Sequence, residues 1–220
     1  RWSCLSGYRI SFLISKMKKI ALIVEYEGSL YKGFQNQKNE QTIQNKIENA
    51  LSMLTTENIE IKAAGRTDAG VHAKSQVISF NTMTQNPIQT YITGTNHFLP
   101  DDISIKNAYE VDIDFDPRRM AISRKYQYSI DCGPTRSPLT AKFAYYLGRA
   151  LNVPIMIKAS KYFLGIHDFK NFSTTKRNES KSTIREIYNI NINQIEKMVY
   201  ITVEGSAFLS HQVRRMCGAL

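Results

Sequence analysis

The chain has 220 residues, of which 42% are hydrophobic and 22% charged, a composition typical of a globular protein. Its formal net charge is +10, and no apolar run approaches the roughly 20 residues that a membrane-spanning helix needs. The three cysteines, Cys4, Cys132 and Cys217, lie far apart, which argues against a zinc site or a disulfide framework and favours a reducing compartment.

Residues 1–16 differ from the rest of the chain. They contain three basic residues, four serines and no acidic residue, and Met17 follows them. This pattern indicates either translated sequence upstream of the true start or the end of an organellar transit peptide.

The first half alternates strand and helix signals. Apolar runs predict strands over 20–26, 59–65, 75–80 and 103–111. A helix is expected over 42–54, because Ile43, Ile47 and Leu51 recur at helical spacing behind Thr42, a plausible N-cap. A second helix is expected over 87–98, with Pro87 at its start. Residues 17–111 therefore predict a compact α+β lobe.

The second half repeats this theme. Strands are expected over 122–131, 183–192 and 198–205, and helices over 154–165 and 207–220. We expect an α+β fold of two similar lobes, 17–111 and 112–220, with mainly antiparallel sheets. Because no helix-ending signal follows Leu220, we also expect the second lobe to be truncated.

The basic excess is confined to one segment. Residues 118–185 hold 14 Lys and Arg side chains against Asp131, Asp168 and Glu179. A localised excess is expected where one surface binds a polyanion such as a nucleic acid. The alternative is a generally basic, solvated surface.

Three stretches carry candidate chemistry. In "GRTDAGVHA" (65–73), two glycines flank Asp68 in a turn, where the carboxylate is either displayed for catalysis or bonded to local amides. In "ISRKYQYSI" (122–130), Tyr126 lies among basic residues, which suits stacking on an unpaired base, although a half-buried strand face is the alternative. In "FLSHQVRRM" (208–216), His211, Arg214 and Arg215 fall close together, and an arginine there either pairs with a carboxylate or is solvated.

These stretches carry a family resemblance. The loop "GRTDAGVHA" resembles the signature of the TruA family of tRNA pseudouridine synthases. The blocks "YEGSLYKGFQNQ", "LPDDI", "FDPRRMAISRKYQY", "HDFKNFS" and "FLSHQVRRMCGAL" are similar to further family blocks in family order, over about residues 17–220. One departure is visible, since Asp116 and Pro117 precede Arg118 where the family often has His-Ala, and Asp116 is expected to weaken a phosphate contact there.

The resemblance implies a central RNA-binding catalytic cleft between the two lobes, an activity and a set of site residues. Family members isomerise uridine to pseudouridine at positions 38, 39 and 40 of the tRNA anticodon stem-loop, as homodimers without cofactor or metal. Asp68 matches the catalytic aspartate, Tyr126 the tyrosine that stacks on the target uracil, and Arg214 the residue that pairs with the aspartate. Further substrate contacts are expected from Arg66, His72, Arg118, Arg124, Lys125 and His167.

The partner and the compartment follow from the same resemblance. We expect tRNA binding, with Arg118, Arg119, Lys125, Lys176, Arg177 and Lys181 contributing to its salt dependence. The expected location is the cytoplasm, or an organelle if residues 1–16 end a transit peptide. The alternative function is a non-catalytic tRNA-binding protein or folding aid.

Overall fold

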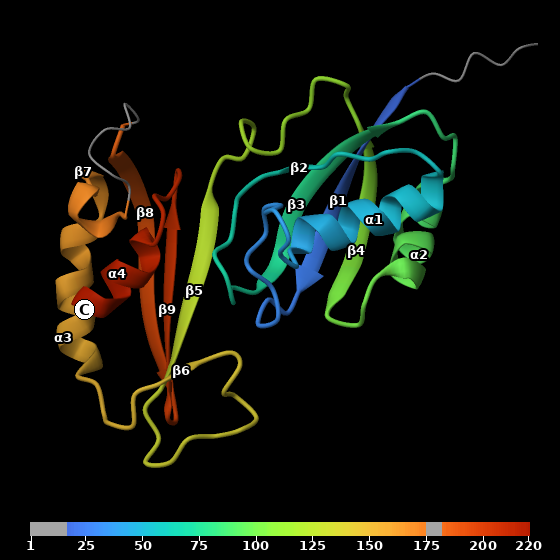
Figure 1. Cartoon of the computed structure of the whole chain (residues 1–220). Helices are drawn as coiled ribbons and strands as arrows, with labels where there is room; N and C mark the ends of the chain where they lie inside the picture. Colours follow the sequence, from blue (N-terminus) through green and yellow to red (C-terminus); the bar gives the residue numbers. More distant parts are fainter. Residues whose placement is uncertain (1–16, 175–181) are drawn as a thin grey trace, which may run out of the picture.

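Two β-sheets, one in each half of the chain, organise the molecule (Figure 1). The computed structural model describes residues 17–174 and 182–220, so the expectations for residues 1–16 and for Lys176, Arg177 and Lys181 lie outside the described residues. The strand orders are β2-β3-β1-β4 and β6-β5-β9-β8-β7. Among the described residues every pairing is antiparallel except that of β5 with β6, so the predicted α+β class is confirmed.

The N-terminal lobe holds the first sheet and two helices. Its elements are β1 (Lys18–Tyr26), α1 (Ile43–Thr55), β2 (Lys62–Ala63), β3 (Ala73–Thr82), α2 (Ile88–Phe98) and β4 (Ile103–Val111). Alternate residues of β1, including Leu22 and Val24, are buried beneath the helices, where they meet Ile47 and Leu51 of α1. The helices therefore cover one face of this sheet and leave its other face for a site.

Helix α1 begins and ends as its sequence predicts. The Thr42 side chain accepts a hydrogen bond from the Asn45 N–H at 3.3 Å, as an N-cap does. The helix ends where Thr56 takes a left-handed conformation and its N–H bonds to the Ser52 carbonyl.

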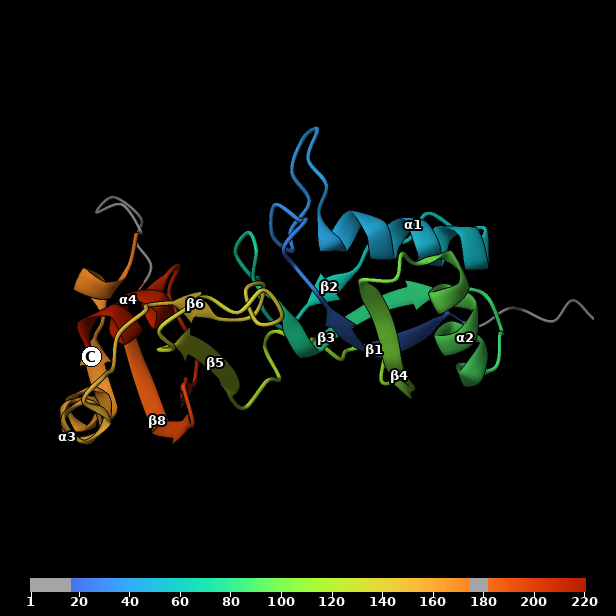
Figure 2. The same ribbon diagram turned by 90° about the horizontal axis from the view of Figure 1, so that it is seen from below.

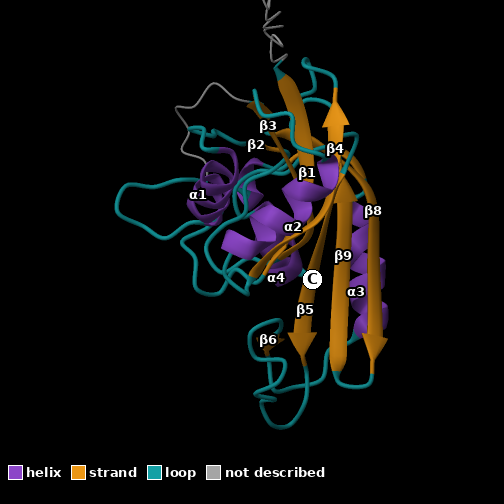
Figure 3. Cartoon of the chain, turned by 90° about the vertical axis from the view of Figure 1, so that its right-hand side faces the viewer, coloured by secondary structure: helices purple, strands orange, loops and turns teal. Residues whose placement is uncertain are grey.

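The C-terminal lobe holds the second sheet. Its elements are β5 (Arg124–Asp131), β6 (Tyr145–Tyr146), α3 (Val153–Ser160), β7 (Gly165–Asp168), β8 (Ile184–Ile195), β9 (Met198–Gly205) and α4 (Gln212–Ala219), with 3-10 turns over Lys161–Phe163 and Lys170–Phe172. Met156 of α3 and Met216 of α4 are buried against Val199 and Ile201 of β9. In Figure 3 the long strands β5, β9 and β8 run side by side, with α3 alongside them.

Several expected boundaries are wrong. The helix predicted over 154–165 ends at Ser160, because the following residues tighten into a 3-10 turn and Gly165 takes φ +89° to start β7. The strand predicted over 59–65 is reduced to Lys62–Ala63. Neither β6 nor β7 is predicted, because both are short and mostly exposed and therefore lack apolar alternation.

The lobes lie next to each other, and residues 112–123 connect them (Figure 2). Strands β5 and β6 are the part of the second sheet nearest the first lobe. In the part of the chain that the structure describes, no helix has the length and apolarity that crossing a bilayer requires.

Candidate active site

A cleft of about 1940 Å³ opens between the two lobes. Its walls include the sheet faces opposite those packed on the helices. Glu25, Val77 and Lys106 line it from the first sheet, and Gln127 and Thr202 line it from the second. The space between the lobes is therefore a broad surface with polar and charged walls.

The loop between β2 and β3 carries Asp68 into this cleft. We call residues 65–72 the Asp68 loop. Its shape is fixed by an earlier segment, since the Phe34 N–H donates to the Thr67 carbonyl at 3.0 Å and the Tyr26 hydroxyl lies 2.8 Å from Thr67 Oγ1. Gly33 lies so close that a Cβ there would stand 2.9 Å from the Thr67 carbonyl oxygen. These contacts hold the backbone while the Asp68 side chain stays exposed.

The imidazole of His211 reaches Asp68 from the other lobe. His211 Nε2 lies 3.5 Å from Asp68 Oδ2. His211 precedes α4 with φ 61°, an uncommon conformation for a residue with a side chain. The turn is held by Gln212, whose fully buried side chain accepts the Leu209 N–H at 2.8 Å. The C-terminal lobe thus presents a potential cation to the candidate catalytic carboxylate.

Tyr126 lies on β5, directly opposite Val203 in the register with β9. Its ring meets the Phe208 ring edge-on, with centroids 5.2 Å apart. Burial raises the pKa of Tyr126, the Arg124 guanidinium lowers it, and the Asp68 carboxylate raises it again. The phenol is therefore protonated at neutral pH and lies within the electrostatic reach of Asp68.

Arg214 lines the same cleft but does not contact Asp68. Its side chain is exposed, and among the described residues no ion pair joins it to a carboxylate. The positive charge of Arg214 lowers the pKa of Tyr128, which places the guanidinium near that residue of β5. The pairing that the resemblance implies stays a prediction, and His211 is in contact with the carboxylate in this structure.

Arg124 bonds to backbone groups of both lobes. Its guanidinium donates to four backbone carbonyls, those of Ala64 (3.3 Å), Arg118 (2.5 Å), Ala121 (3.2 Å) and Ser206 (2.8 Å). Arg118 and Ala121 belong to the connection between the lobes, Ala64 to the N-terminal lobe and Ser206 to the C-terminal lobe. Arg124 therefore joins the lobes through both terminal nitrogens of its guanidinium, and its contact with a substrate phosphate stays a prediction.

The remaining cleft cations are more accessible. Arg66 and Arg118 are exposed and line the cleft, and among the described residues neither makes an ion pair. Lys125 also lines it, but its Nζ lies 3.4 Å from a Glu204 carboxylate oxygen. Asp116 accepts the N–H groups of Arg119 and Arg118, each at 2.9 Å, which lowers its pKa. Asp116 therefore shapes the turn that displays Arg118.

The two histidines of the predicted substrate contacts bond to backbone groups of the protein, and their contacts with tRNA stay predictions. Both ring nitrogens of His72 bond to protein backbone groups, the Gly28 N–H and the Lys142 carbonyl. His167 lies on β7, which is the sheet edge opposite β6, and its Nε2 bonds to the Leu164 carbonyl at 2.7 Å. It does not belong to the cleft lining within the described residues.

The structure also brings to the site His211, which the sequence singles out without a role, and two residues that it does not single out. His211 stands three positions before Arg214 in the same sequence block, and that proximity is the signal that marks it. Lys142 and Phe143 come from the loop between β5 and β6, where the sequence gives no signal. Within residues 17–174 and 182–220, no three His, Cys, Asp or Glu side chains are grouped as metal ligands.

Comparison with known proteins identifies the family. The family model described as tRNA pseudouridine synthase matches residues 22–118 and 159–220. The chain belongs to the tRNA pseudouridine synthase family. It is 38% identical over 204 residues to the tRNA pseudouridine synthase A of Acetivibrio thermocellus, covering 93% of this chain and 83% of that protein.

Other relatives cover similar lengths. The tRNA pseudouridine synthase A of Ruminiclostridium cellulolyticum is 41% identical over 205 residues, which is 93% of this chain and 83% of the relative. That of Actinobacillus pleuropneumoniae serotype 7 is 38% identical over 202 residues, 92% of this chain and 77% of the relative. The residues matched by the family model include the Asp68 loop and α4, and they omit residues 119–158, which contain Tyr126.

Proposed function

We propose that the chain isomerises uridine to pseudouridine in tRNA, at positions 38, 39 and 40 of the anticodon stem-loop. The observation that carries this proposal is the convergence of Asp68, Tyr126 and His211 from both lobes on one cleft. The cleft has a volume of about 1940 Å³ and is lined by exposed cations, which suits a polyanionic substrate. Homodimeric assembly and a cytoplasmic location belong to the same proposal.

The reaction needs an extruded base. The bond between the uracil N1 and the ribose must break, the base must turn, and C5 must bond to the same sugar carbon while its proton leaves. Because a uridine in a stem is stacked and paired, it is flipped out of the helix before reaction. Tyr126 supplies a ring for stacking, and Phe208 holds that ring from its edge.

Asp68 supplies the negative charge that the reaction requires. An ionised carboxylate acts as a nucleophile or stabilises a cationic sugar. His211 is near enough to orient the carboxylate, and Arg214 lies in the same cleft. The Tyr126 phenol, which keeps its proton at neutral pH, acts as a hydrogen-bond donor and stacking surface.

The second candidate is a tRNA-binding protein without catalysis. It is supported by the exposure of Arg66 and Arg118, which suits phosphate contacts. The two functions differ in one measurable product, since only an enzyme converts uridine to pseudouridine in a bound anticodon stem-loop.

Replacement of the carboxylate tests the proposal. Asp68→Asn keeps the shape of the side chain and removes its charge, so turnover should fall far more than tenfold while tRNA affinity changes little. Asp114→Asn, an exposed aspartate beyond the cleft lining, is the matched control. Pseudouridine is counted by mass spectrometry of digested tRNA, and residual Asp68→Asn turnover within about tenfold of the parent contradicts the catalytic assignment.

A further inference from the structure

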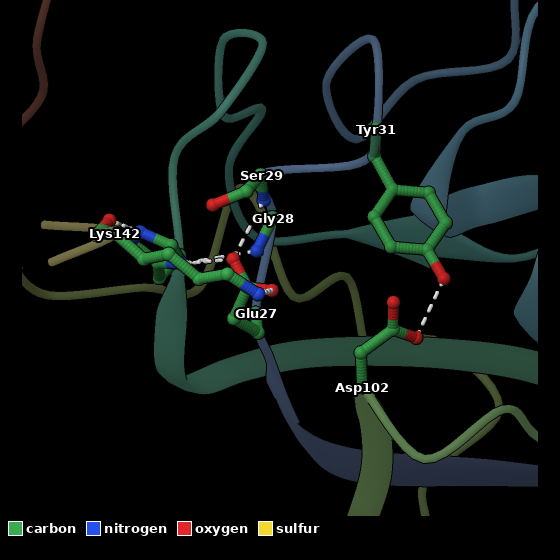
Figure 4. A network of polar contacts seen from close by, with 7 residues as sticks. Glu27, Gly28, Ser29, Tyr31, Asp102 and Lys142 are labelled. Atoms are coloured by element: carbon green, nitrogen blue, oxygen red, sulfur yellow. Dashed lines mark hydrogen bonds and ion pairs between the residues drawn. The ribbon is translucent and has the colours of Figure 1, made fainter. Parts of the chain in front are cut away.

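The loop between β5 and β6 crosses to the N-terminal lobe and touches the end of the Asp68 loop. We call residues 132–144 the crossing loop. Its Lys142 carbonyl lies 2.8 Å from His72 Nε2, and the rings of Phe143 and His72 pack with centroids 4.9 Å apart. Lys142 Nζ lies 3.4 Å from a Glu27 carboxylate oxygen, as Figure 4 shows from close by. The two lobes therefore meet here at a point separate from Arg124.

His72 is bonded on both sides by backbone groups. The Gly28 N–H donates to His72 Nδ1 at 3.0 Å. Because an N–H cannot accept, Nδ1 carries no proton in this arrangement, and the proton on Nε2 donates to the Lys142 carbonyl. A Glu27 oxygen also approaches Nδ1 to 3.4 Å, but the shorter Gly28 bond requires a neutral ring, so we do not regard this approach as an ion pair.

Glu27 and Lys142 are the charged groups beside this imidazole. The hydrogen bonds of Ser29 lower the pKa of Glu27, and Lys142 lowers it further. Both side chains of the Glu27–Lys142 pair are partly or largely solvated, so this ion pair contributes little to holding the lobes together. The neutral hydrogen bonds of His72 and its ring contact are the specific part of the junction.

The Gly28 side of this junction supports the Asp68 loop directly. A Cβ on Gly28 would lie 2.1 Å from the Val71 carbonyl oxygen, so the two backbones approach as only glycine permits. The next residues continue the support, because the Gly70 N–H donates to the Tyr31 carbonyl at 3.3 Å. The Tyr31 hydroxyl in turn donates to Asp102 at 2.6 Å, which ties this turn to the start of β4 (Figure 4).

We propose that His72 is a positioning residue that joins the Asp68 loop to the C-terminal lobe. Its Nδ1 bonds the Asp68 loop to Gly28, and its Nε2 bonds the Asp68 loop to the crossing loop. The junction sets the separation of the lobes at the end of the cleft that holds Asp68. This role replaces the substrate contact expected for His72, and it rests on the proposed catalytic function of the Asp68 loop.

Two substitutions separate the two bonds of the ring. His72→Asn places an amide oxygen near the position of Nδ1, so it keeps the acceptor for Gly28 and loses the donor for Lys142. His72→Gln extends its amide toward the position of Nε2, so it keeps the donor for Lys142 and loses the Gly28 acceptor. His97→Asn, on the exposed face of α2, is the matched control.

Hydrogen exchange of the full chain without tRNA measures the junction independently of activity. We expect His72→Asn to raise exchange several-fold in residues 132–144 and to change residues 65–72 little. His72→Gln should raise exchange in residues 65–72 and, because it also loses the ring contact with Phe143, raise it in residues 132–144 less than His72→Asn does, while His97→Asn should change neither region. If His72→Asn leaves the crossing loop at the parent level, His72 does not hold the lobes together and the proposal is overturned.

Kinetics test whether the junction positions the chemistry. Both variants should lower kcat by about 10- to 100-fold, because a small displacement of reacting groups has effects of this size. The KM for tRNA should change less than about twofold, since His72 is not assigned a tRNA contact. Raised exchange with an unchanged kcat overturns the positioning role. If Asp68→Asn remains active, the catalytic proposal is contradicted but the exchange results for His72 still stand. The two proposals can therefore be rejected independently.

Discussion

The carboxylate of Asp68 meets the side chain of His211, the residue directly before α4. The family resemblance implies Asp68 and Tyr126 as site residues, whereas their local composition leaves a turn and a half-buried strand face as alternatives. The contact of His211 with Asp68 and the four carbonyl bonds of Arg124 are invisible in sequence. Both depend on how the lobes pack, and an arginine that bonds carbonyls has the same local pattern as one that bonds phosphates.

Removal of the His211 imidazole tests its effect on Asp68. Asparagine tolerates left-handed backbone conformation, so His211→Asn keeps the turn before α4. Because the two side chains are 40% and 44% exposed, their contact is partly screened. We expect kcat to fall by up to about fivefold with little change in melting temperature.

A second histidine provides the control for that experiment. His167→Asn changes a residue of β7 outside the cleft lining, so single-turnover rates should match the parent. Equal losses for His167→Asn and His211→Asn would contradict both the assignment of His211 and the position of His167 outside the cleft lining.

At the scale of elements, length decides what the sequence predicts. The helix α1 and the strands β1, β4 and β9 have enough residues for their apolar spacing to be clear, and each lies close to its predicted range. The two-residue β2 and β6 have no such spacing. The short elements nevertheless border the Asp68 loop and the crossing loop, so the least predictable elements are those that shape the site.

Gly33 tests how the Asp68 loop is supported. Gly33→Ala would put a Cβ 2.9 Å from the Thr67 carbonyl oxygen at φ +94°, where the strain alone costs about 1–2 kcal/mol. The loop must shift to relieve that contact, so kcat should fall by about 10- to 100-fold while the protein stays folded. Circular dichroism and single-turnover assays measure the two effects.

Gly218→Ala is the matched control for Gly33→Ala. Gly218 lies in α4, and a Cβ there meets nothing within 4 Å. Alanine favours helix over glycine by up to about 1 kcal/mol, so this variant should be as stable as the parent or more so. A parental kcat in Gly33→Ala would show that the Asp68 loop does not depend on this close approach.

At the scale of the molecule, the basic side chains are arranged differently in space from how they are arranged along the sequence. The sequence assigns the basic excess to residues 118–185, yet the cations lining the cleft come from both lobes. They are Lys62, Arg66, Lys74, Lys106, Arg118, Arg124, Lys125, Lys142 and Arg214. Lys158 and Lys161, which contribute to the sequence excess, lie on α3 and the turn after it and do not line the cleft. Folding therefore redistributes the charge, and a count along the chain cannot locate the tRNA surface.

Two triple variants of equal charge test this surface. The first replaces Lys62, Lys74 and Arg118 with alanine; all three are exposed in the cleft and, among the described residues, make no ion pair. The second replaces Lys158, Lys161 and Lys170, which lie outside the cleft lining. Both remove three positive charges, so any general effect of net charge is the same. Affinity for an anticodon stem-loop RNA is measured over a range of salt concentrations.

Counterion release predicts a difference between these variants. Each phosphate contact contributes about 0.7 to 0.9 to the slope of log K against log salt. If each cleft cation meets one phosphate, the first triple should flatten the slope by about 2 to 3. The second should lower affinity slightly and keep the parental slope, because distant charges attract the RNA without releasing counterions at a contact. A parental slope in the first triple would place the tRNA outside the cleft, and Asp68 would then lie away from the bound anticodon stem-loop.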